Sequence, residues 1–417
     1  MKVVLIILDG LQDDNVIGGC TPVEHAKAET LHNIARQSMP VVVKTMFHGL
    51  PVGSIVANLG LLGYDPYKYF PDGRSFFELR ARYDGPIGED DLILRCNTIS
   101  ANENDDISDF TAGQIPDDLA KNVIAEVAKK LPFHYELYHG KNYRNVLLIR
   151  DSSLKPCDIV AFEPHSRIGS NLFDLRIIHA NRKLSLEQKK EIQYLNSVMF
   201  ATIRYLAEIN KTANSKADML WFWAPSYPAV LFDFREHFGF SNSWVITGSD
   251  FLYGIAKEAN IDFAVNDRYT GESDTDFAGK GREAVQKLKE GVDFLFIHIN
   301  ATDEESHQRD YESKVKMIEV IDRKIIRPVF DCVRSMDDDV TMIIGGDHYT
   351  SSESGNHLDN DAPFVVYRPK TPVDIVTRYS EREIIDKAGP TIMSTDLINA
   401  VLSNGSAVLP LRERSDG

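Results

Sequence analysis

The chain has 417 residues, of which 43% are hydrophobic, so it can build a large packed core and is long enough for two or three domains, or for one large domain with an insertion. No segment is rich enough in Pro, Ser or charge to be disordered. The formal net charge of −16 argues against nucleic acid or an anionic membrane as the main partner. A local basic pocket can still bind a phosphate ester within an acidic protein.

The ends and the cysteines indicate a cytoplasmic protein. The apolar start at residues 3–8 is too short for a signal peptide and runs directly into Asp9. No run approaches the ~20 apolar residues of a membrane span. The cysteines are scattered without metal-type pairing, so we expect reduced thiols with buried structural roles. They are Cys20, Cys96, Cys157 and Cys332.

The N-terminal segment begins with a strand and continues with a helix. Residues 3–10, VVLIILDG, are typical of a buried parallel strand. Residues 21–37 predict one helix, with Thr21 as N-cap, Pro22 at the first position and Glu24 three residues after the cap.

The middle of the chain has a different pattern. From about residue 83 to 170, a strand, a helix and two further strands follow one another, in the segments DDLILRCNTIS, LAKNVIAEVAKKL, FHYELYHG and YRNVLLIRD. This pattern predicts a small α+β domain inserted into a larger one. A long helix from Ser185 to Asn210 would then carry the chain back to the core.

Strands and helices alternate again in the last 175 or so residues. Helices are predicted at 281–291 and 313–336. The predicted strands have the sequences SWVITGSD, IDFAVND, DFLFIHIN, VTMIIGGDH and APFVVYR. The whole pattern predicts an α/β fold, a mostly parallel sheet sandwiched by helices, built from residues 1–84 and 176–417 with an inserted domain at 85–175.

Carboxylates and histidines follow several of these strands. In such sheets, ligands bind beyond the carboxyl ends of the strands, where Asp9, Asp303 and Asp347 are expected. Asp303 and His307 are four residues apart, which places them on one face of a helix and close enough to share a metal ion. The alternative is a solvated helix start, because acidic residues suit a helix N-terminus.

Asp347 and His348 follow a buried strand and two glycines that allow a sharp turn. His357 lies nine residues further on as a third donor. The alternative is a polar turn with surface histidines. With Asp303 and His307, these residues supply enough ligands for two divalent cations.

A hydroxyl nucleophile is available at Ser54, between Gly53 and an apolar helix. The alternatives are that Ser54 only caps this helix and that Asp9 only caps a turn. A helix N-terminus stabilises a phosphoryl group, and a metal lowers the pKa of a hydroxyl. The sequence therefore predicts an enzyme that acts on a phosphoryl group through two metals and a serine.

These motifs occur in an order that resembles a known family. The chain is similar to the cofactor-independent phosphoglycerate mutases of the archaeal type, within the alkaline phosphatase superfamily. The resemblance covers almost the whole chain. It is carried by ILDG with TPVEHA, GSIVANLGLLGYDP, GRSFFE, RCN, DFTAGQI, YRNVLLIR, EPH, LWFWAP, HINATDEESH, GGDH and a final His before DNDAPFVVY.

The resemblance implies an alkaline phosphatase-like core, two metal ions and a phosphoserine intermediate at Ser54. It implies that a substrate phosphate moves to the serine and returns to a neighbouring oxygen. The inserted domain would be a substrate-handling lid, with arginines suited to gripping phosphate or carboxylate. The implied ligands of one metal are Asp303, His307 and His357, those of the second are Asp9, Ser54, Asp347 and His348, and the implied lid residues are Arg95, Asp109, Arg144 and His165.

The chain departs from the family in several substrate-binding segments. Ile55 follows the serine where the family has Asp, and residues 211–219 lack the family's arginine. APSYP replaces a glycine-containing turn, and RYTGESDT replaces a GATG-like loop.

We therefore expect interconversion of 2- and 3-phosphoglycerate or a close analogue, in a 2,3-bisphosphoglycerate-independent, glycolytic reaction. The alternatives are a phosphatase or phosphodiesterase acting on another small phosphorylated or phosphonate metabolite, and a non-catalytic pseudoenzyme. The mixed Asp, His and Ser ligands suit Mn²⁺ and Zn²⁺ better than Mg²⁺. The expected partner is a small phosphorylated acid, and the sequence carries no signal of the oligomeric state.

Overall fold

A computed structural model describes residues 1–403, which divide into two compact units. Unit 1 is formed by Met1–Phe70, Leu231–Ser249 and the described part of Ala256–Gly417, and unit 2 by Pro71–Val230 with Asp250–Ile255. The predicted core domain extended to residue 417, so its last fourteen residues, 404–417, lie outside the described residues.

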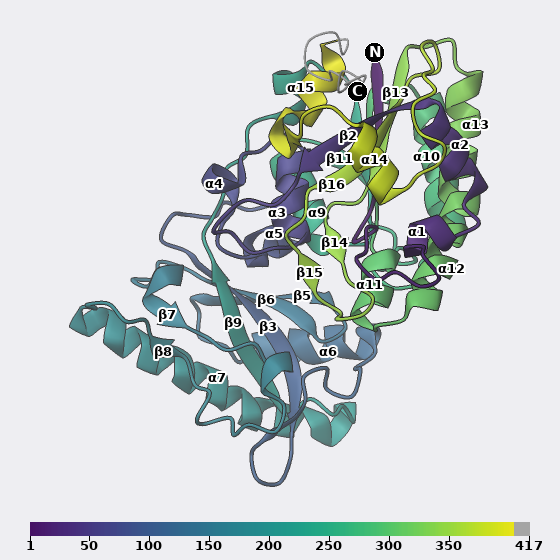
Figure 1. Cartoon of the computed structure of the whole chain (residues 1–417). Helices are drawn as coiled ribbons and strands as arrows, with labels where there is room; N and C mark the ends of the chain where they lie inside the picture. The colour runs from purple at the N-terminus through teal and green to yellow at the C-terminus, as the bar shows by residue number, and fades with distance from the viewer. Residues whose placement is uncertain (404–417) are drawn as a thin grey trace. The chain divides into compact units, whose positions relative to one another are not determined.

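Unit 1 contains one large sheet of eight strands, in the order β11-β10-β12-β1-β13-β16-β2-β17 (Figure 1). The strands are β1 (Lys2–Leu8), β2 (Ser38–Lys44), β10 (Ser243–Ile246), β11 (Asp262–Phe263), β12 (Phe294–Ile299), β13 (Val340–Gly345), β16 (Ala362–Tyr367) and β17 (Ile392–Met393). Strands β1, β10, β11, β12 and β13 are mutually parallel. Strand β16 runs antiparallel to both β13 and β2, so the other seven strands point one way. The predicted mostly parallel α/β fold is confirmed.

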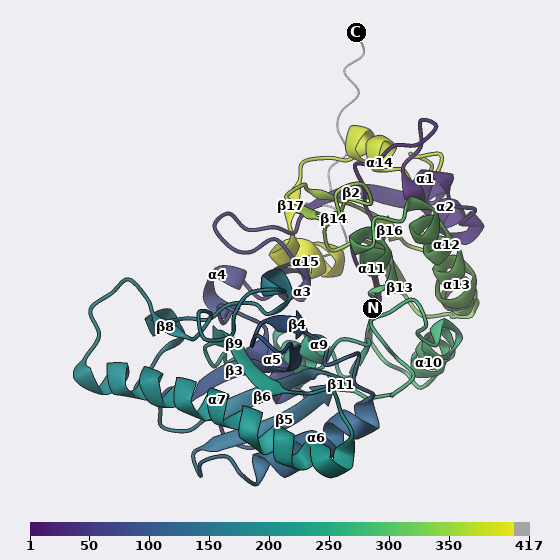
Figure 2. The same cartoon turned by 90° about the horizontal axis from the view of Figure 1, so that it is seen from below.

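The helices of unit 1 cover both faces of this sheet (Figures 1 and 2). Helices α2, α10, α12 and α13 pack on one face, and α3 and α8 pack on the other, where Asn58 of α3 reaches His298 and Phe234 of α8 packs on Phe294. The helices are α1 (Pro22–His25), α2 (Glu29–Arg36), α3 (Ser54–Leu61), α4 (Pro66–Tyr69), α8 (Phe234–Phe238), α10 (Phe277–Lys289), α11 (Ala301–His307), α12 (Tyr311–Ile321), η3 (Asp322–Ile326), α13 (Arg327–Ser335), α14 (Glu381–Lys387), η4 (Ser394–Asp396) and α15 (Leu397–Leu402). A short hairpin is formed by β14 (Tyr349–Thr350) and β15 (His357–Leu358).

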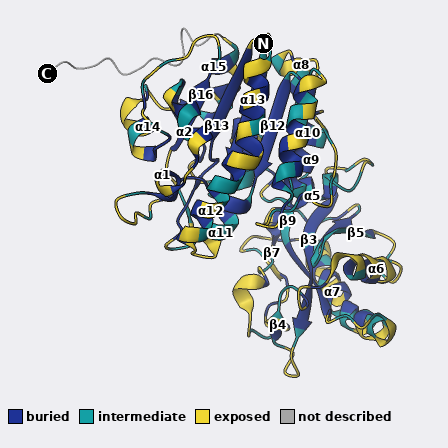
Figure 3. Cartoon of the chain, turned by 90° about the vertical axis from the view of Figure 1, so that its right-hand side faces the viewer, coloured by how far each residue is buried: buried dark blue, intermediate teal, exposed yellow. Residues whose placement is uncertain are grey.

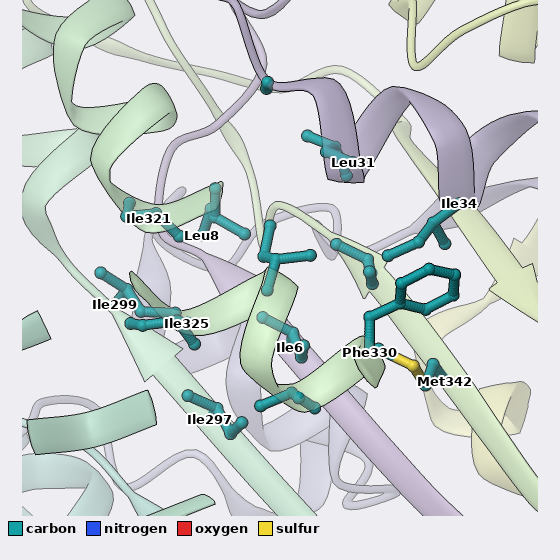
Figure 4. Close-up of a cluster of buried hydrophobic side chains, with 14 of the residues drawn as sticks. Ile6, Leu8, Leu31, Ile34, Ile297, Ile299, Ile321, Ile325, Phe330 and Met342 are labelled. Carbon is teal, nitrogen blue, oxygen red and sulfur yellow. The ribbon is translucent and has the colours of Figure 1, made fainter. Parts of the chain in front are cut away.

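The core of unit 1 lies between the centre of the sheet and the first of these helix layers. Side chains of β1 alternate, so Ile6 and Leu8 face α2, α12 and α13, where Leu31, Ile321 and Phe330 meet them (Figure 4). The strands at the centre are buried along their whole length, while the helices expose their outer sides (Figure 3). Burial on both faces explains the continuous apolar runs seen in the sequence.

Two predicted helices of unit 1 are interrupted. The segment 21–37 forms α1 and α2 instead of one helix, because Ala26 after the first turn takes an extended conformation. The segment 313–336 continues from α12 through the π-helical turn η3 into α13, where Pro328 sits in the first turn and cannot donate the regular backbone hydrogen bond.

Unit 2 is built on a sheet in the order β4-β3-β6-β5, with β9 on the other edge of β3. Its elements are α5 (Ser75–Arg80), β3 (Leu92–Ala101), β4 (Ile107–Asp109), α6 (Asp117–Ala128), β5 (Tyr135–Lys141), β6 (Arg144–Ile149), η1 (Pro156–Asp158), β7 (Ile159–Val160), η2 (His165–Arg167), β8 (Ile178–His179), α7 (Leu186–Ala213) and β9 (Met219–Ser226). Helix α9 (Asp250–Glu258) contributes residues to both units.

Unit 2 is wider than the inserted segment predicted at 85–175. Helix α7 does not lead the chain back to the large sheet: its Leu195, Met199 and Leu206 lie in the core of unit 2. Strand β9 then pairs with β3, so the chain leaves unit 2 only after residue 230. An amphipathic helix does not show in its sequence which sheet it covers.

All four cysteines lie in the described part of the chain, and each is a free thiol, as expected. The expected burial holds for Cys96 and Cys332 but is wrong for Cys20, which is half-buried, and for Cys157, which is exposed. Within residues 1–403, no helix combines the length and the apolar character that a bilayer crossing requires.

Candidate metal centre

The carboxyl edge of the large sheet collects all seven residues predicted as metal ligands. Asp9 follows β1, the helix α11 with Asp303 and His307 follows β12, and Asp347 and His348 follow β13. Strand β2 is parallel to these strands, so the loop after it brings Ser54 to the same edge. Strand β16 is antiparallel, so the residues before it, which include His357, also lie there.

Ser54 begins helix α3, and its hydroxyl points to the other residues of the cluster. Its Oγ lies 3.2 and 3.3 Å from the two carboxylate oxygens of Asp9 and 3.2 Å from Nε2 of His348. Gly53, not Ser54, occupies the N-cap position of α3. The alternative in which Ser54 only caps the helix therefore does not hold.

A second group of donors surrounds Asp303. Nε2 of His307 lies 3.1 Å from Oδ2 of Asp303, and Nε2 of His357 lies 3.5 Å from Oδ1. The two Nε2 atoms are 3.2 Å apart. The ring of His348 lies 4.2 Å from that of His357, so His348 connects this group to Ser54 and Asp9.

The hydrogen bonds of the histidines fit a cation at this position. Nδ1 of His307 faces the carbonyl of Gly355 at 2.8 Å, and Nδ1 of His357 faces that of Val52 at 3.1 Å. A carbonyl only accepts, so Nδ1 carries a hydrogen in both rings. In the metal-free protein a protonated Nε2 donates to Asp303, and a bound cation would replace that proton and take the Nε2 lone pair. Metal-binding histidines are held in this way, with the second nitrogen donating to a carbonyl.

The electrostatics of the carboxylates also favour a cation. Burial and the neighbouring Asp347 raise the pKa of Asp9 well above its ordinary value. Burial acts in the same direction on Asp303, but hydrogen bonds from His307 and His357 hold its pKa well below the usual range. The hydrogen bond to Asp303 raises the pKa of His307 to about 9. Three buried carboxylates close together need compensating positive charge.

The loop after β1 has no room for a side chain at Gly10. Its φ is +60°, and a Cβ atom would lie 2.5 Å from Oγ1 of Thr350 and 2.7 Å from Oδ1 of Asp303. Thr350 donates to Oδ1 of Asp303 at 2.6 Å. The buried Lys314 fixes the same loop, because its Nζ contacts Asp13 and the carbonyl of Thr350, both at 2.8 Å.

Several residues of this edge were not predicted from the sequence. Nδ2 of Asn300 donates to Asp9 Oδ2, and Nδ2 of Asn58 donates to Asp347 Oδ2, both at 2.8 Å. His298, on β12, lies with Asp9 and Asp347 in a group whose donor atoms are within 4.8 Å of one another. A polar residue inside the apolar strand LFIHIN is the sequence signal that marks His298.

The four predicted substrate-binding residues are in unit 2. Arg95 of β3 pairs with Glu78 at 3.0 Å, and its guanidinium lies 4.7 Å from the ring centroid of Trp223. The ring of His165 packs 5.8 Å from that of Trp223. Arg144 is opposite Asn97, on the same face of the sheet as Arg95. These cations and their aromatic neighbours form what we call the cationic cluster, consisting of Arg95, Arg144, His165, Trp223, Phe110 and Tyr143.

Asp109 has a local role in this unit. Its Oδ1 accepts from the backbone N–H and the hydroxyl of Thr111 at 2.7 and 2.6 Å, and its Oδ2 accepts from the N–H of Gly113 at 2.8 Å. Although partial burial acts the other way, these bonds hold the pKa of Asp109 below its ordinary value. Both oxygens therefore shape the turn after β4.

Comparisons with known proteins agree with this arrangement. The family model of the metalloenzyme superfamily matches residues 1–399. The 2,3-bisphosphoglycerate-independent phosphoglycerate mutase of Methanothrix thermoacetophila is 30% identical over 416 residues, which are 97% of this chain and 100% of the relative. The enzyme of the same name from Methanosarcina mazei is 28% identical over 97% of this chain and 100% of its own.

Solved structures share the fold. A protein from Pyrococcus horikoshii aligns with a TM-score of 0.75 at 23% identity, over 98% of this chain and 99% of its own. The cofactor-independent phosphoglycerate mutase from Thermoplasma acidophilum aligns with a TM-score of 0.63 at 22% identity, over 97% and 100%. The chain is thus a member of the metalloenzyme superfamily, whose members bind divalent metal ions, and belongs to the family of 2,3-bisphosphoglycerate-independent phosphoglycerate mutases.

Proposed function

We propose that this protein interconverts 2- and 3-phosphoglycerate, or a close analogue, by moving the phosphoryl group through Ser54. The observation that carries the proposal is the position of the Ser54 hydroxyl, 3.2 Å from both Asp9 Oδ1 and His348 Nε2 at the start of a helix. The names of the relatives, matched over almost the full length of the chain, support the substrate.

Two divalent ions would be held by the seven clustered side chains. We assign one ion to Asp303, His307 and His357, and the second to Asp9, Ser54, Asp347 and His348. Imidazole and carboxylate donors in this proportion favour Mn²⁺ or Zn²⁺ over Mg²⁺. Ions bound here supply Lewis-acid charge that lowers the pKa of the serine hydroxyl and neutralises phosphoryl oxygens.

The residues of the chain then have separate tasks in the reaction. The hydrogen bond to Asp9 directs the Ser54 proton to a carboxylate and leaves a lone pair of Oγ for attack on phosphorus. An Oγ–P bond forms while the bond from phosphorus to the substrate oxygen breaks, and the released oxygen takes the proton that Ser54 gave up. In the return transfer the neighbouring hydroxyl oxygen forms a bond to phosphorus as the Oγ–P bond breaks, and its proton passes to Oγ, which restores Ser54. Since all atoms return to one molecule, the net reaction is an isomerisation.

We also propose that the cationic cluster binds an anionic group of the substrate, as the lid residues of the family would. Arg144 is its best candidate, because within residues 1–403 no carboxylate forms an ion pair with it, whereas Arg95 is paired with Glu78. Asp109 would act indirectly, by holding the turn after β4. The free thiols agree with a reducing, cytoplasmic location.

Phosphorus NMR tests the proposal and separates it from hydrolysis. The full chain with Mn²⁺ or Zn²⁺ should convert 3-phosphoglycerate to the 2-isomer without a stoichiometric inorganic phosphate signal. Ile55 and the altered loops make a hydrolase the alternative outcome, in which water takes the phosphoryl group and free phosphate accumulates.

A serine variant tests the nucleophile. Ser54→Ala should lower turnover by roughly 10³-fold or more, because removing a covalent nucleophile leaves only binding and electrostatic effects. Ser38→Ala is the control, since Ser38 is a serine of unit 1 whose hydroxyl, among the described residues, bonds the carbonyl of Ile34 and lies outside the metal centre. Turnover of Ser54→Ala within tenfold of the wild type would disprove the phosphoserine route.

A further inference from the structure

His298 is a buried polar side chain in the middle of the large sheet. It lies on β12 with no exposed surface, on the face where Phe294 and Phe296 are also fully buried. Burying an imidazole in such a place is costly unless other polar groups contact it. The groups that do so belong to the metal centre and its supports.

The contacts of His298 connect the two carboxylates assigned to the second ion. Its Nε2 lies 3.5 Å from Oδ2 of Asp9 and 3.8 Å from Oδ2 of Asp347. Asn58 reaches the same nitrogen at 3.5 Å. His298 therefore lies within 3.8 Å of the Oδ2 atoms of both carboxylates, Asp9 and Asp347.

The two oxygens of Asp9 share one neighbour and differ in the others. Ser54 Oγ lies 3.2 Å from Oδ1 and 3.3 Å from Oδ2, while His348 Nε2 contacts Oδ1 at 3.2 Å. Oδ2 also accepts from Asn300, whose side-chain oxygen is in turn held by Ser249 at 2.8 Å. His298 contacts this Oδ2 atom.

The same environment argues against His298 as a metal ligand. The side-chain N–H groups of Asn300 and Asn58 donate to the two Oδ2 atoms at 2.8 Å. A cation among these oxygens and His298 would face the positive ends of two amide dipoles. The arrangement is that of donors surrounding carboxylates, which is how supporting residues orient metal ligands.

We propose that His298 is a positioning residue that holds Asp9 and Asp347 in the orientation needed for the second ion. This inference rests on the proposed function, because it assigns that ion to Asp9, Ser54, Asp347 and His348. It predicts that His298 contributes to metal affinity without supplying a ligand. Asn58 and Asn300 support one carboxylate each, and His298 fixes the two relative to each other.

The test compares three variants of the full chain by titration with Mn²⁺ alone. The variants are His298→Ala, His298→Gln, which keeps an N–H donor near the position of Nε2, and Phe296→Leu. Phe296 lies two residues away on the same face of β12, 6.0 Å from the His298 ring, so its truncation controls for damage to the core. Calorimetry gives affinity and stoichiometry, and scanning calorimetry gives the melting temperature of the metal-free protein.

We expect His298→Ala to weaken binding of one Mn²⁺ ion by roughly 10- to 100-fold, with two ions still bound at saturation. His298→Gln should recover most of the affinity, and Phe296→Leu should bind as the wild type does. Unchanged affinity in His298→Ala would reduce the residue to a structural role and overturn the proposal. Loss of one ion at saturation would make it a ligand and also overturn it.

The titration is independent of the reaction. If the wild type binds two ions and the variants behave as expected while phosphoglycerate is not isomerised, the proposed function fails and the role of His298 stands. If isomerisation is found but His298→Ala binds Mn²⁺ normally, the proposed function stands and the role proposed for His298 fails.

Discussion

The metal centre of unit 1 and the cationic cluster of unit 2 differ in how firmly their residues are held. In the metal centre, Asp9 and Asp347 are fully buried and accept hydrogen bonds from Asn300 and Asn58, while His307 and His357 are partly exposed but held by carbonyls of Gly355 and Val52. In the cationic cluster, the side chain of His165 is 48% exposed. Arg144 is stacked on Tyr143 at 4.6 Å, and no carboxylate among residues 1–403 forms an ion pair with it.

This difference matches the two proposed tasks, which are phosphoryl transfer at the metal centre and substrate binding at the cationic cluster. A set of donors held by hydrogen bonds is oriented before any ligand arrives, so the loss of one member damages the whole set. A partly exposed cation contributes a graded share of binding, because water replaces part of what is lost. The departures from the family pattern near Ile55 and in residues 211–219 alter neither the seven clustered residues nor the six of the cationic cluster.

The largest effect is expected when the metal centre loses a charge. Asp303→Asn keeps the shape of the side chain but removes the anion that His307, His357 and Thr350 surround. We expect kcat to fall by roughly 10³-fold or more, since the electrostatic contribution of a metal is lost with it. Metal content by mass spectrometry should show fewer than two ions per chain.

Asp310→Asn serves as the control for this prediction. Asp310 is also an aspartate at the start of a helix, where its carboxylate accepts from the backbone N–H and the hydroxyl of Ser313. It should keep full metal content. A variant at Asp303 that retains two ions and normal turnover would contradict the view that the centre acts as one set.

A smaller effect is expected in the cationic cluster. Arg144→Ala should raise KM about 10- to 100-fold and change kcat less, because a charge-assisted bond to an anion contributes about 1.5–3 kcal/mol. Steady-state kinetics with 3-phosphoglycerate measures this. Arg204→Ala, which removes an exposed arginine stacked on Tyr205 in the same unit, is the control and should be neutral. Equal losses of kcat and kcat/KM would mean that Arg144 stabilises the transition state of phosphoryl transfer and does not only bind the substrate.

The smallest effect concerns stability and pH in unit 1. Burial raises the pKa of Glu381 to about 7, and Thr21 donates to its carboxylate at 2.7 Å. The folded state therefore keeps a proton that an unfolded glutamate loses near pH 4.3, so stability falls as the pH rises from about 5 to 8. Glu381→Gln lacks this loss, so its free energy of unfolding relative to the wild type should increase with pH, by at most about 4 kcal/mol.

Chemical denaturation at pH 5 and pH 8 measures the difference between the two proteins. Glu383→Gln, on the same helix and half-exposed, controls for the loss of a charge on α14. A constant difference between Glu381→Gln and the wild type at the two pH values would show that Glu381 is ionised in the folded protein throughout this range.

Much of unit 1 was predictable because its strands are apolar runs that end in ligands. The strands β1, β10, β11, β12, β13 and β16 were all expected, and the rule for carboxyl ends brought Asp9, Asp303 and Asp347 together. The direction of β16 was not predictable, because a short run is equally apolar in either direction. Strand β2 was missed, since Pro40 within it argues against a strand.

The supporting residues of the site were harder to predict for a different reason. His298, Asn58 and Asn300 are not spaced as metal ligands, and their role depends on packing between α3 and β12. The placement of α7 failed similarly, because amphipathicity shows that a helix is half-buried but not which sheet it covers. Contacts between residues far apart in the sequence determine the role of these three side chains and the sheet that α7 covers.

The central position of β1 has a consequence for how the protein folds. Val3 pairs with Phe294 on one side and with Thr341 on the other, so both neighbours of β1 lie far downstream in the sequence. Contacts this distant in sequence make folding slow, and they leave an apolar segment unpaired during synthesis. Asp9 and Ser54 are synthesised before β12 and β13, so they can meet Asp303, His307, Asp347 and His348 only after those strands have been made.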